Sequence, residues 1–158
     1  MNLKEILGDA RKVVICGIGN ENRADDAFGV VVAEKLRKTL RNPDVVVINC
    51  GEVPESYTGV IKKHEPDAVI FVDAIEFGGK PGEIVTADPE GTLGSAASTH
   101  SLPLRVIVQY LKAELKGCRF ILVGCQPGST ALFGEMTEEV KKSAERLAGL
   151  IEDMLKGL

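Results

Sequence analysis

The first predicted strand is Lys12-Val13-Val14-Ile15-Cys16, a mostly apolar, β-branched run typical of a strand buried on both faces. A glycine-containing loop follows, and then residues 27–40, whose charged positions are confined to one side of a helix. Strand and helix together predict a βα unit, which is the repeating element of parallel sheets.

The same alternation of strand and helix patterns continues along the chain. We predict strands at 45–48, 68–72, 83–87 and 120–123, and helices at 54–64, 102–115 and 137–155. Several of the strands are apolar throughout, which favours a largely parallel sheet covered on both faces. The predicted fold class is α/β, a three-layer α/β/α sandwich whose five-stranded sheet has room for one antiparallel edge strand. No linker or repeat interrupts the pattern, so residues 1–158 are expected to form a single domain.

Composition excludes two classes of partner. A net charge of −4 and a pI near 5.3, with acidic and basic residues mixed, argue against a nucleic-acid surface. No apolar run approaches the roughly 20 residues that a membrane span needs, and the N-terminus does not resemble a signal peptide. A cytoplasmic protein without a membrane span is expected.

Cysteine and serine nucleophiles are both disfavoured. The four cysteines form no CxxC pair and lie in or beside apolar segments, so buried free thiols are expected. Ser98, His100 and Ser101 lie close together in the sequence, but there is no G-x-S-x-G motif and the serines lie in a predicted loop. A Ser-His-Asp hydrolase therefore has little support.

The loop at Gly17–Asn22 begins like a dinucleotide-binding fingerprint but departs from it. Asn22 stands where the third glycine or alanine is needed for close helix packing. No GxxxxGK[ST] loop is present either. Two readings of Gly17 and Gly19 remain open: they permit a tight turn at the strand end, or they leave room for the backbone of a bound partner.

Three polar residues stand where strands give way to loops or a helix is about to begin. Asp26 follows the first strand, Asp73 closes the strand at 68–72, and His100 precedes the helix at 102–115. Because the carboxyl ends of parallel strands open into one crevice, these residues are expected to converge. Two carboxylates and an imidazole would make an open metal site.

The residues neighbouring this trio have simpler interpretations. Asp25 and Asp26 stand at the start of a predicted helix, where one of them could serve only as an N-cap, leaving the other free to face the crevice. His64 follows two lysines near a predicted helix end, where a cation suits the helix dipole, and we assign it no function. Residues 88–101, rich in small and polar residues, are predicted to form a mobile loop.

The chain resembles the [NiFe] hydrogenase maturation endopeptidases. The opening Ile15-Cys16-Gly17-Ile18-Gly19-Asn20, followed by Ala24-Asp25-Asp26-Ala27-Phe28-Gly29, is similar to the family's G-x-G-N…[DG]-D-[DE]-x-x-G pattern. The likeness continues in Val72-Asp73-Ala74, Pro81-Gly82-Glu83-Ile84, Ser98-Thr99-His100-Ser101-Leu102-Pro103-Leu104 and Gly124-Cys125-Gln126-Pro127. These pieces cover nearly the whole chain in order, and the last ones are most similar to the branch that processes hydrogenase-3-type large subunits, such as that of formate hydrogenlyase.

The resemblance implies an endopeptidase that removes a short C-terminal extension from a hydrogenase large-subunit precursor after nickel insertion. Asp26, Asp73 and His100 match the family's metal-contacting residues, and they would contact nickel that the substrate carries. The free enzyme is then expected to hold no metal, in agreement with the absence of an HExxH motif. Nickel could polarise the scissile carbonyl or supply a hydroxide, and a carboxylate could act as general base, as in aspartic-type chemistry.

The same resemblance implies that the C-terminal tail of the substrate binds in the crevice. Gly17, Gly19, Asn20, Gly51 and Glu55 would line it, since a tail lying there needs close backbone approach. The loop that carries His100 would close over the tail as a lid.

Two other functions compete with the peptidase. One is a non-catalytic metal-binding chaperone or sensor module of hydrogenase maturation. The other is an endopeptidase with a different protein substrate, since a fold does not determine its target and the spore-protein proteases share a similar architecture. Oligomeric state does not follow from any of these observations.

Overall fold

The computed structural model describes residues 2–91 and 101–157, and its centre is one five-stranded sheet. The strand order is β2-β1-β3-β5-β4. Neighbouring strands pair in parallel except for β4, which runs antiparallel to β5 at one edge. The strands are β1 (Val13–Ile18), β2 (Val45–Gly51), β3 (Ala68–Ala74), β4 (Ile84–Ala87) and β5 (Arg119–Cys125). The predicted α/β class and the antiparallel edge strand are both confirmed.

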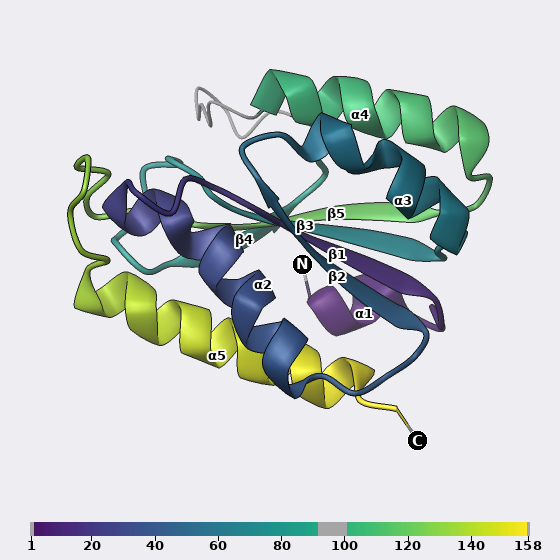
Figure 1. Cartoon of the computed structure of the whole chain (residues 1–158), viewed down its shortest axis with the longest axis horizontal. Helices are drawn as coiled ribbons and strands as arrows, with labels where there is room; N and C mark the ends of the chain where they lie inside the picture. Colours follow the sequence, from purple (N-terminus) through teal and green to yellow (C-terminus); the bar gives the residue numbers. More distant parts are fainter. Residues whose placement is uncertain (1, 92–100, 158) are drawn as a thin grey trace.

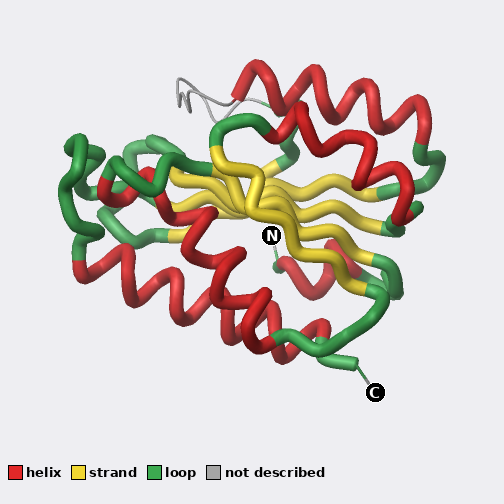
Figure 2. Tube along the Cα trace, viewed as in Figure 1, coloured by secondary structure: helices red, strands yellow, loops and turns green. Residues whose placement is uncertain are grey.

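Helices cover both faces of the sheet, which gives three layers (Figures 1 and 2). Helices α1, α2 and α5 pack on one face, and α3 and α4 pack on the other. Their bounds are α1 (Leu3–Leu7), α2 (Phe28–Thr39), α3 (Thr58–His64), α4 (Ser101–Glu114) and α5 (Glu138–Leu155). In the described part of the chain, no helix has the length and apolar character that crossing a membrane requires.

The core divides into two apolar clusters because side chains alternate across each strand. In β3, Ile70 and Val72 pack toward α2 and α5, whereas Val69 and Phe71 pack toward α3 and α4. All seven residues of β3 are buried, as expected for a central parallel strand.

The boundaries of several elements differ from the prediction at their polar ends. The helix predicted at 27–40 begins as the 3-10 turn η1 (Ala24–Ala27) before α2, and that at 54–64 begins as η2 (Pro54–Tyr57) before α3. The short α1, for which we predicted no element, is capped by the Asn2 side chain, which accepts a hydrogen bond from Lys4 N at 2.9 Å.

The order of the strands reverses at β1, and this reversal positions the site. The chain passes from β1 to β2 through α2 on one face, and from β2 to β3 through α3 on the opposite face. Strands β2 and β3 therefore flank β1 on opposite sides. In open α/β sheets, the crevice at such a switch point lies beyond the carboxyl ends of the strands and is the usual ligand site.

The start of α2 presses against the backbone at this crevice. A Cβ atom built on Gly29 would lie 2.0 Å from the carbonyl oxygen of Val72 and 2.3 Å from that of Ile18. A Cβ atom on Gly17 would lie 2.2 Å from the carbonyl oxygen of Gly29. Two glycines therefore allow the helix to begin in contact with both β1 and β3.

Substituting Gly29 by alanine should displace the start of α2. We expect Gly29→Ala to lower the free energy of unfolding by about 3 kcal/mol, because backbone atoms fill the space that the methyl group needs. Gly149, exposed in α5 with no atom within 4 Å of its Cβ position, is the matched control. Gly149→Ala should raise stability by about 0.5–1 kcal/mol. Urea denaturation of both variants measures the contrast, and equal effects would contradict this account of Gly29.

Candidate active site

Asp26 lies on the turn η1, which joins β1 to α2. Its side chain is half-buried, and Oδ2 accepts a hydrogen bond from the backbone N–H of Asn20 at 3.2 Å. The turn begins at Ala24 with a φ of 47°, a left-handed conformation that costs a non-glycine residue about 1 kcal/mol or more. The turn also packs against β3. The Asp26 carboxylate is therefore held at the carboxyl end of β1, beside the strand that carries Asp73.

Asp25 is fully buried and makes a different set of contacts. Its carboxylate accepts hydrogen bonds from the backbone N–H groups of Gly128 (2.8 Å), Ser129 (3.0 Å) and Thr137 (2.7 Å), and from the Thr137 hydroxyl (2.8 Å). These donors lie more than 100 residues further along the chain. Asp25 therefore anchors the loop between β5 and α5, which leaves Asp26 as the acid of the pair that lies at the crevice.

The prediction that one of these two acids caps the following helix is wrong. The residue at the N-cap of α2 is Ala27, and no side chain caps the helix. Both acids lie within the turn η1, before the first turn of α2, and their carboxylates accept hydrogen bonds from loop residues instead.

Asp73 is the penultimate residue of β3 and is fully buried. It pairs in register with Gly124 of β5. Because side chains alternate along a strand, Asp73 shares a face with Phe71, the face covered by α3 and α4. Its carboxylate is thus placed at the carboxyl end of the central strand, on the side where α4 begins.

His100 and most of the predicted loop at 88–101 lie outside the described residues. Helix α4 starts at Ser101, so His100 is the residue directly before the helix that covers the Asp73 face. Of the predicted loop, residues 88–91 form a turn in which Gly91 N donates to Asp88 O at 2.9 Å. Among the described residues, no group of three His, Cys, Asp or Glu side chains is arranged to hold a metal ion.

Three of the five predicted substrate contacts lie together in one cavity. Gly19, Asn20 and Gly51 contribute to a hollow of about 240 Å³ between the ends of β1 and β2. Its walls are mostly polar and include residues of the loop after β1, of α2 and of the end of β2 with the residue that follows it, in full Glu21, Asn22, Val30, Asn49 and Glu52. The Cβ position of Gly51 is open, so the backbone there is accessible to a bound chain.

The other two predicted contacts are not part of this cavity. Gly17 is buried, and the space beside it is filled by Gly29 and Ala33 of α2. The structure thus assigns to Gly17 a role in helix packing. Glu55 is exposed on η2 and is not among the residues that line the cavity.

Gln126 is a residue of the site region to which the sequence analysis gave no role. Its Oε1 accepts hydrogen bonds from the backbone N–H groups of Phe77 (2.9 Å) and Gly79 (3.1 Å), and its Nε2 donates to Glu76 at 2.7 Å. The side chain therefore fixes the loop that follows β3, a few residues beyond Asp73. The available signal was a polar residue directly after the apolar strand β5, the same signal that identified Asp73.

The cysteines are free thiols, as predicted, and three of the four are buried. Burial raises the pKa of Cys118 and of Cys125 to about 11. The neighbouring Cys50 thiol and burial raise the pKa of Cys16 well above its usual value. Because the thiolate is the nucleophilic form, these shifts argue against Cys16, Cys118 and Cys125 as nucleophiles at neutral pH.

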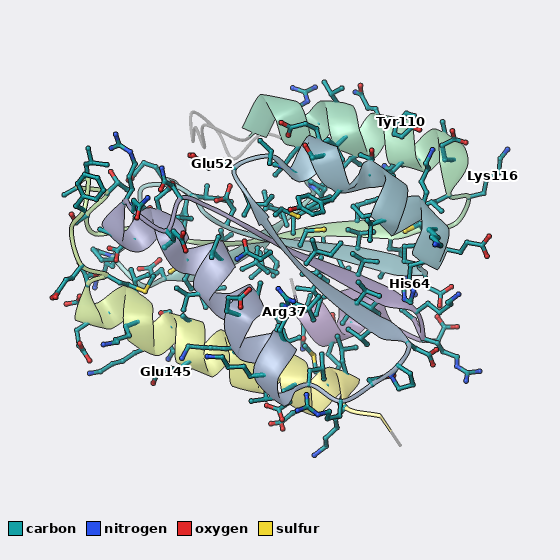
Figure 3. All side chains as sticks on the ribbon, viewed as in Figure 1. Arg37, Glu52, His64, Tyr110, Lys116 and Glu145 are labelled. Carbon is teal, nitrogen blue, oxygen red and sulfur yellow. The ribbon has the colours of Figure 1, made fainter. Side chains whose placement is uncertain are left out.

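His64 lies far from the crevice. Its Nε2 is 2.8 Å from the carbonyl oxygen of Asp44, which precedes β2. Figure 3 labels it at the opposite end of the sheet from Glu52, which lines the cavity. His64 therefore lies outside the candidate site.

The fold and the site define a doubly wound α/β protein with two carboxylates at its switch point, and comparisons with known proteins give the family. A family model described as hydrogenase maturation protease matches residues 30–154. The hydrogenase 3 maturation protease of Escherichia coli K12 is 30% identical, over 89% of this chain and 88% of that protein. A Methanocaldococcus jannaschii protein named as a hydrogenase maturation protease is 32% identical, over 99% of this chain and 98% of its own.

Solved structures give the same result. The crystal structure of a [NiFe] hydrogenase maturation protease, HycI from Thermococcus kodakarensis KOD1, superposes with a TM-score of 0.91 at 54% identity, covering 98% of this chain and 99% of that one. The solution structure of the Escherichia coli endopeptidase HycI superposes with a TM-score of 0.77 at 29% identity, covering 90% of each chain. The chain belongs to the hydrogenase maturation protease family and is a hydrolase.

The two adjacent acids should respond differently to substitution. Asp25→Ala leaves three backbone N–H groups and a hydroxyl without their acceptor, and we expect it to lower the free energy of unfolding by about 3 kcal/mol. In Asp26→Asn the amide oxygen can still accept from Asn20 N, so stability should change by less than about 0.5 kcal/mol. Chemical denaturation measures both; a reversed order would contradict the assignment of Asp25 as the anchor.

Proposed function

We propose that this hydrolase removes a C-terminal extension from a [NiFe] hydrogenase large-subunit precursor once nickel has been inserted. The observation that carries the proposal is the placement of Asp26 and Asp73 at the β1/β3 switch point of a hydrogenase maturation protease. The relatives named as hydrogenase maturation proteases match 99% and 89% of the chain, so the whole domain is available for the task of such a protease.

Nickel enters this proposal as part of the substrate. Asp26 and Asp73, joined by His100, contact the nickel of the precursor and leave coordination positions for the precursor's own ligands. Two carboxylates and one imidazole suit a borderline divalent ion such as Ni²⁺. A precursor without nickel cannot make these contacts, which would explain how the enzyme discriminates in favour of the loaded form.

Cleavage follows from the same contacts. The nickel polarises the scissile carbonyl, or a water beside it, and a carboxylate of the site accepts the proton of the attacking water and passes it to the leaving nitrogen as the C–N bond breaks. A carboxylate activates the water, as in aspartic-type peptidases, so no serine or cysteine nucleophile is needed.

The extension itself lies in the polar cavity beside Asp26. Gly19, Asn20 and Gly51 line it, and because their backbone N–H groups already donate to Gly51 O, Asp26 Oδ2 and Asn49 Oδ1, an extended peptide would donate to carbonyl oxygens of this wall. The Asn20 side chain is held by its Nδ2, which donates to Glu52 at 3.3 Å, so the groups that meet the peptide are already oriented. The free thiols fit a reducing compartment, in line with action in the cytoplasm.

The direct test is mass spectrometry of a cognate large-subunit precursor after incubation with the protein, with and without nickel. We expect loss of a C-terminal peptide from the nickel-loaded precursor alone. Asp26→Ala, Asp73→Ala and His100→Ala should each lower the rate by at least about a hundredfold, the usual scale for removing a group that acts on the reacting atoms.

His64→Ala is the control for these substitutions, because His64 is the other histidine and lies far from the crevice. It should cleave at the wild-type rate. An intact precursor in every reaction, despite measured nickel loading and binding, would contradict the peptidase and favour a non-catalytic chaperone or sensor that holds the metal. Equal cleavage of nickel-free precursor would contradict the role of nickel.

Thiol reagents provide a second test. With a pKa near 11, Cys118 and Cys125 carry about a hundredfold less thiolate at pH 8 than a thiol of pKa 9. Iodoacetamide at pH 8 should therefore modify the folded protein slowly and leave precursor cleavage unchanged. Rapid alkylation with parallel loss of cleavage, measured by mass spectrometry, would point to a catalytic cysteine instead.

A further inference from the structure

A loop between β5 and α5 exposes two large apolar side chains at its tip. Leu132 is 55% exposed and Phe133 is 77% exposed, and we call these two residues the apolar tip. In Figure 1 the loop protrudes beside the start of α2, at the end of the sheet where the parallel strands finish. Isolated exposed apolar residues are common, but two adjacent ones on a protruding tip need a reason.

The tip is held in place by hydrogen bonds. The buried Asp25 carboxylate anchors both ends of the loop, at Gly128 and Thr137. Within the loop, Phe133 N donates to the carbonyl oxygen of Asn22 at 2.5 Å, and Gly134 N donates to Ala131 O at 2.9 Å. The tip is therefore an ordered feature whose side chains face solvent.

The backbone conformation of Phe133 is unfavourable for a residue with a large side chain, so the turn does not explain why a phenylalanine stands there. Its φ is 59°, a left-handed conformation in which a bulky residue is a clear outlier. Glycine or asparagine would adopt it with less strain. A phenylalanine that is strained, exposed and fixed in position suggests a contact outside the chain.

The position of the tip indicates which contact this is. Asn22, which holds Phe133, also lines the polar cavity next to Asp26, and the anchor Asp25 directly precedes Asp26. Hydrogen bonds thus join the tip to the turn that carries the reacting acid. When a protein places its C-terminal tail in the crevice, its folded body must lie over the edge of the crevice, where the apolar tip protrudes.

We propose that Leu132 and Phe133 dock into an apolar depression on the folded body of the large-subunit precursor, beside the point where its C-terminal extension emerges. This inference rests on the proposed function for the identity of the partner. Anchors of this kind, a large aromatic residue on a rigid support, carry much of the affinity in protein interfaces. The tip then selects the folded precursor, while the crevice acts on the tail.

The test combines two substitutions at the tip with a matched control. Phe133→Asn keeps a residue that tolerates the left-handed conformation, so stability should be unchanged or higher, and binding can be measured on a folded protein. Leu132→Ser is matched by Leu150→Ser, since Leu150 is 51% exposed on α5. Binding of nickel-loaded precursor is measured by biolayer interferometry in an Asp26→Asn background that the tip variants, the Leu150 control and the reference protein all share, so that the precursor stays intact and the altered nickel contact affects each of them equally. Cleavage kinetics are measured with Asp26 present.

We expect Phe133→Asn to weaken precursor binding about tenfold and to raise KM by a similar factor with kcat unchanged. Leu132→Ser should act in the same direction, and Leu150→Ser should match the wild type. Binding and KM within twofold of wild type for both tip variants would overturn the docking role while leaving cleavage, and so the proposed function, intact.

Three further outcomes are distinguishable. If wild-type protein binds the precursor without cleaving it, the peptidase proposal fails, and the tip variants still decide the docking role through binding alone. If the tip variants change only the oligomeric state, measured by light scattering, and precursor binding stays at the wild-type value, the tip is a contact between copies of this chain and the proposal is overturned. Absence of precursor binding by wild-type protein overturns both.

Discussion

The buried carboxylate of Asp25 is the interaction on which the end of the sheet depends. A fully buried charge is stable only when donors surround it, and here three backbone N–H groups and a hydroxyl do so. All four donors belong to the segment between β5 and α5, whereas Asp25 belongs to the turn between β1 and α2. One side chain therefore joins two connections that the sequence separates by more than 100 residues.

Two of the three non-glycine residues with a positive φ in the described chain lie beside this anchor. Ala24 directly precedes it and Phe133 belongs to the loop that it holds, whereas the third, Glu65, ends α3. The close packing of Gly29 on the ends of β1 and β3 fixes the start of α2 beneath them. These contacts keep Asp26 at the crevice without burying it completely, and a site in a hydrolase needs its polar groups held in place in this way.

The region that follows β3 is supported separately. Gln126 bonds to the loop at 76–79 from the end of β5, so each of the two acidic positions has a polar residue that fixes the chain beside it. Asp25 fixes the rim next to Asp26, and Gln126 fixes the loop next to Asp73. Both supports involve the segment that leaves β5. Asp25 accepts hydrogen bonds from this segment, and Gln126 belongs to it.

The sequence by itself determined the fold class and most of the elements, though not α1 or the two 3-10 turns, because hydrophobic periodicity records which face of each element is buried. It also indicated that Asp26 comes after one strand and that Asp73 closes another, with the ends of the two strands at the same edge of the sheet. It did not distinguish Asp25 from Asp26, since adjacent acids look alike and their partners lie far along the chain. Nor did it show that Gly17 packs against α2 or that Gln126 binds a loop. Only the tertiary structure decided these points, because hydrogen bonds and close packing between distant segments leave no periodic signal in the sequence.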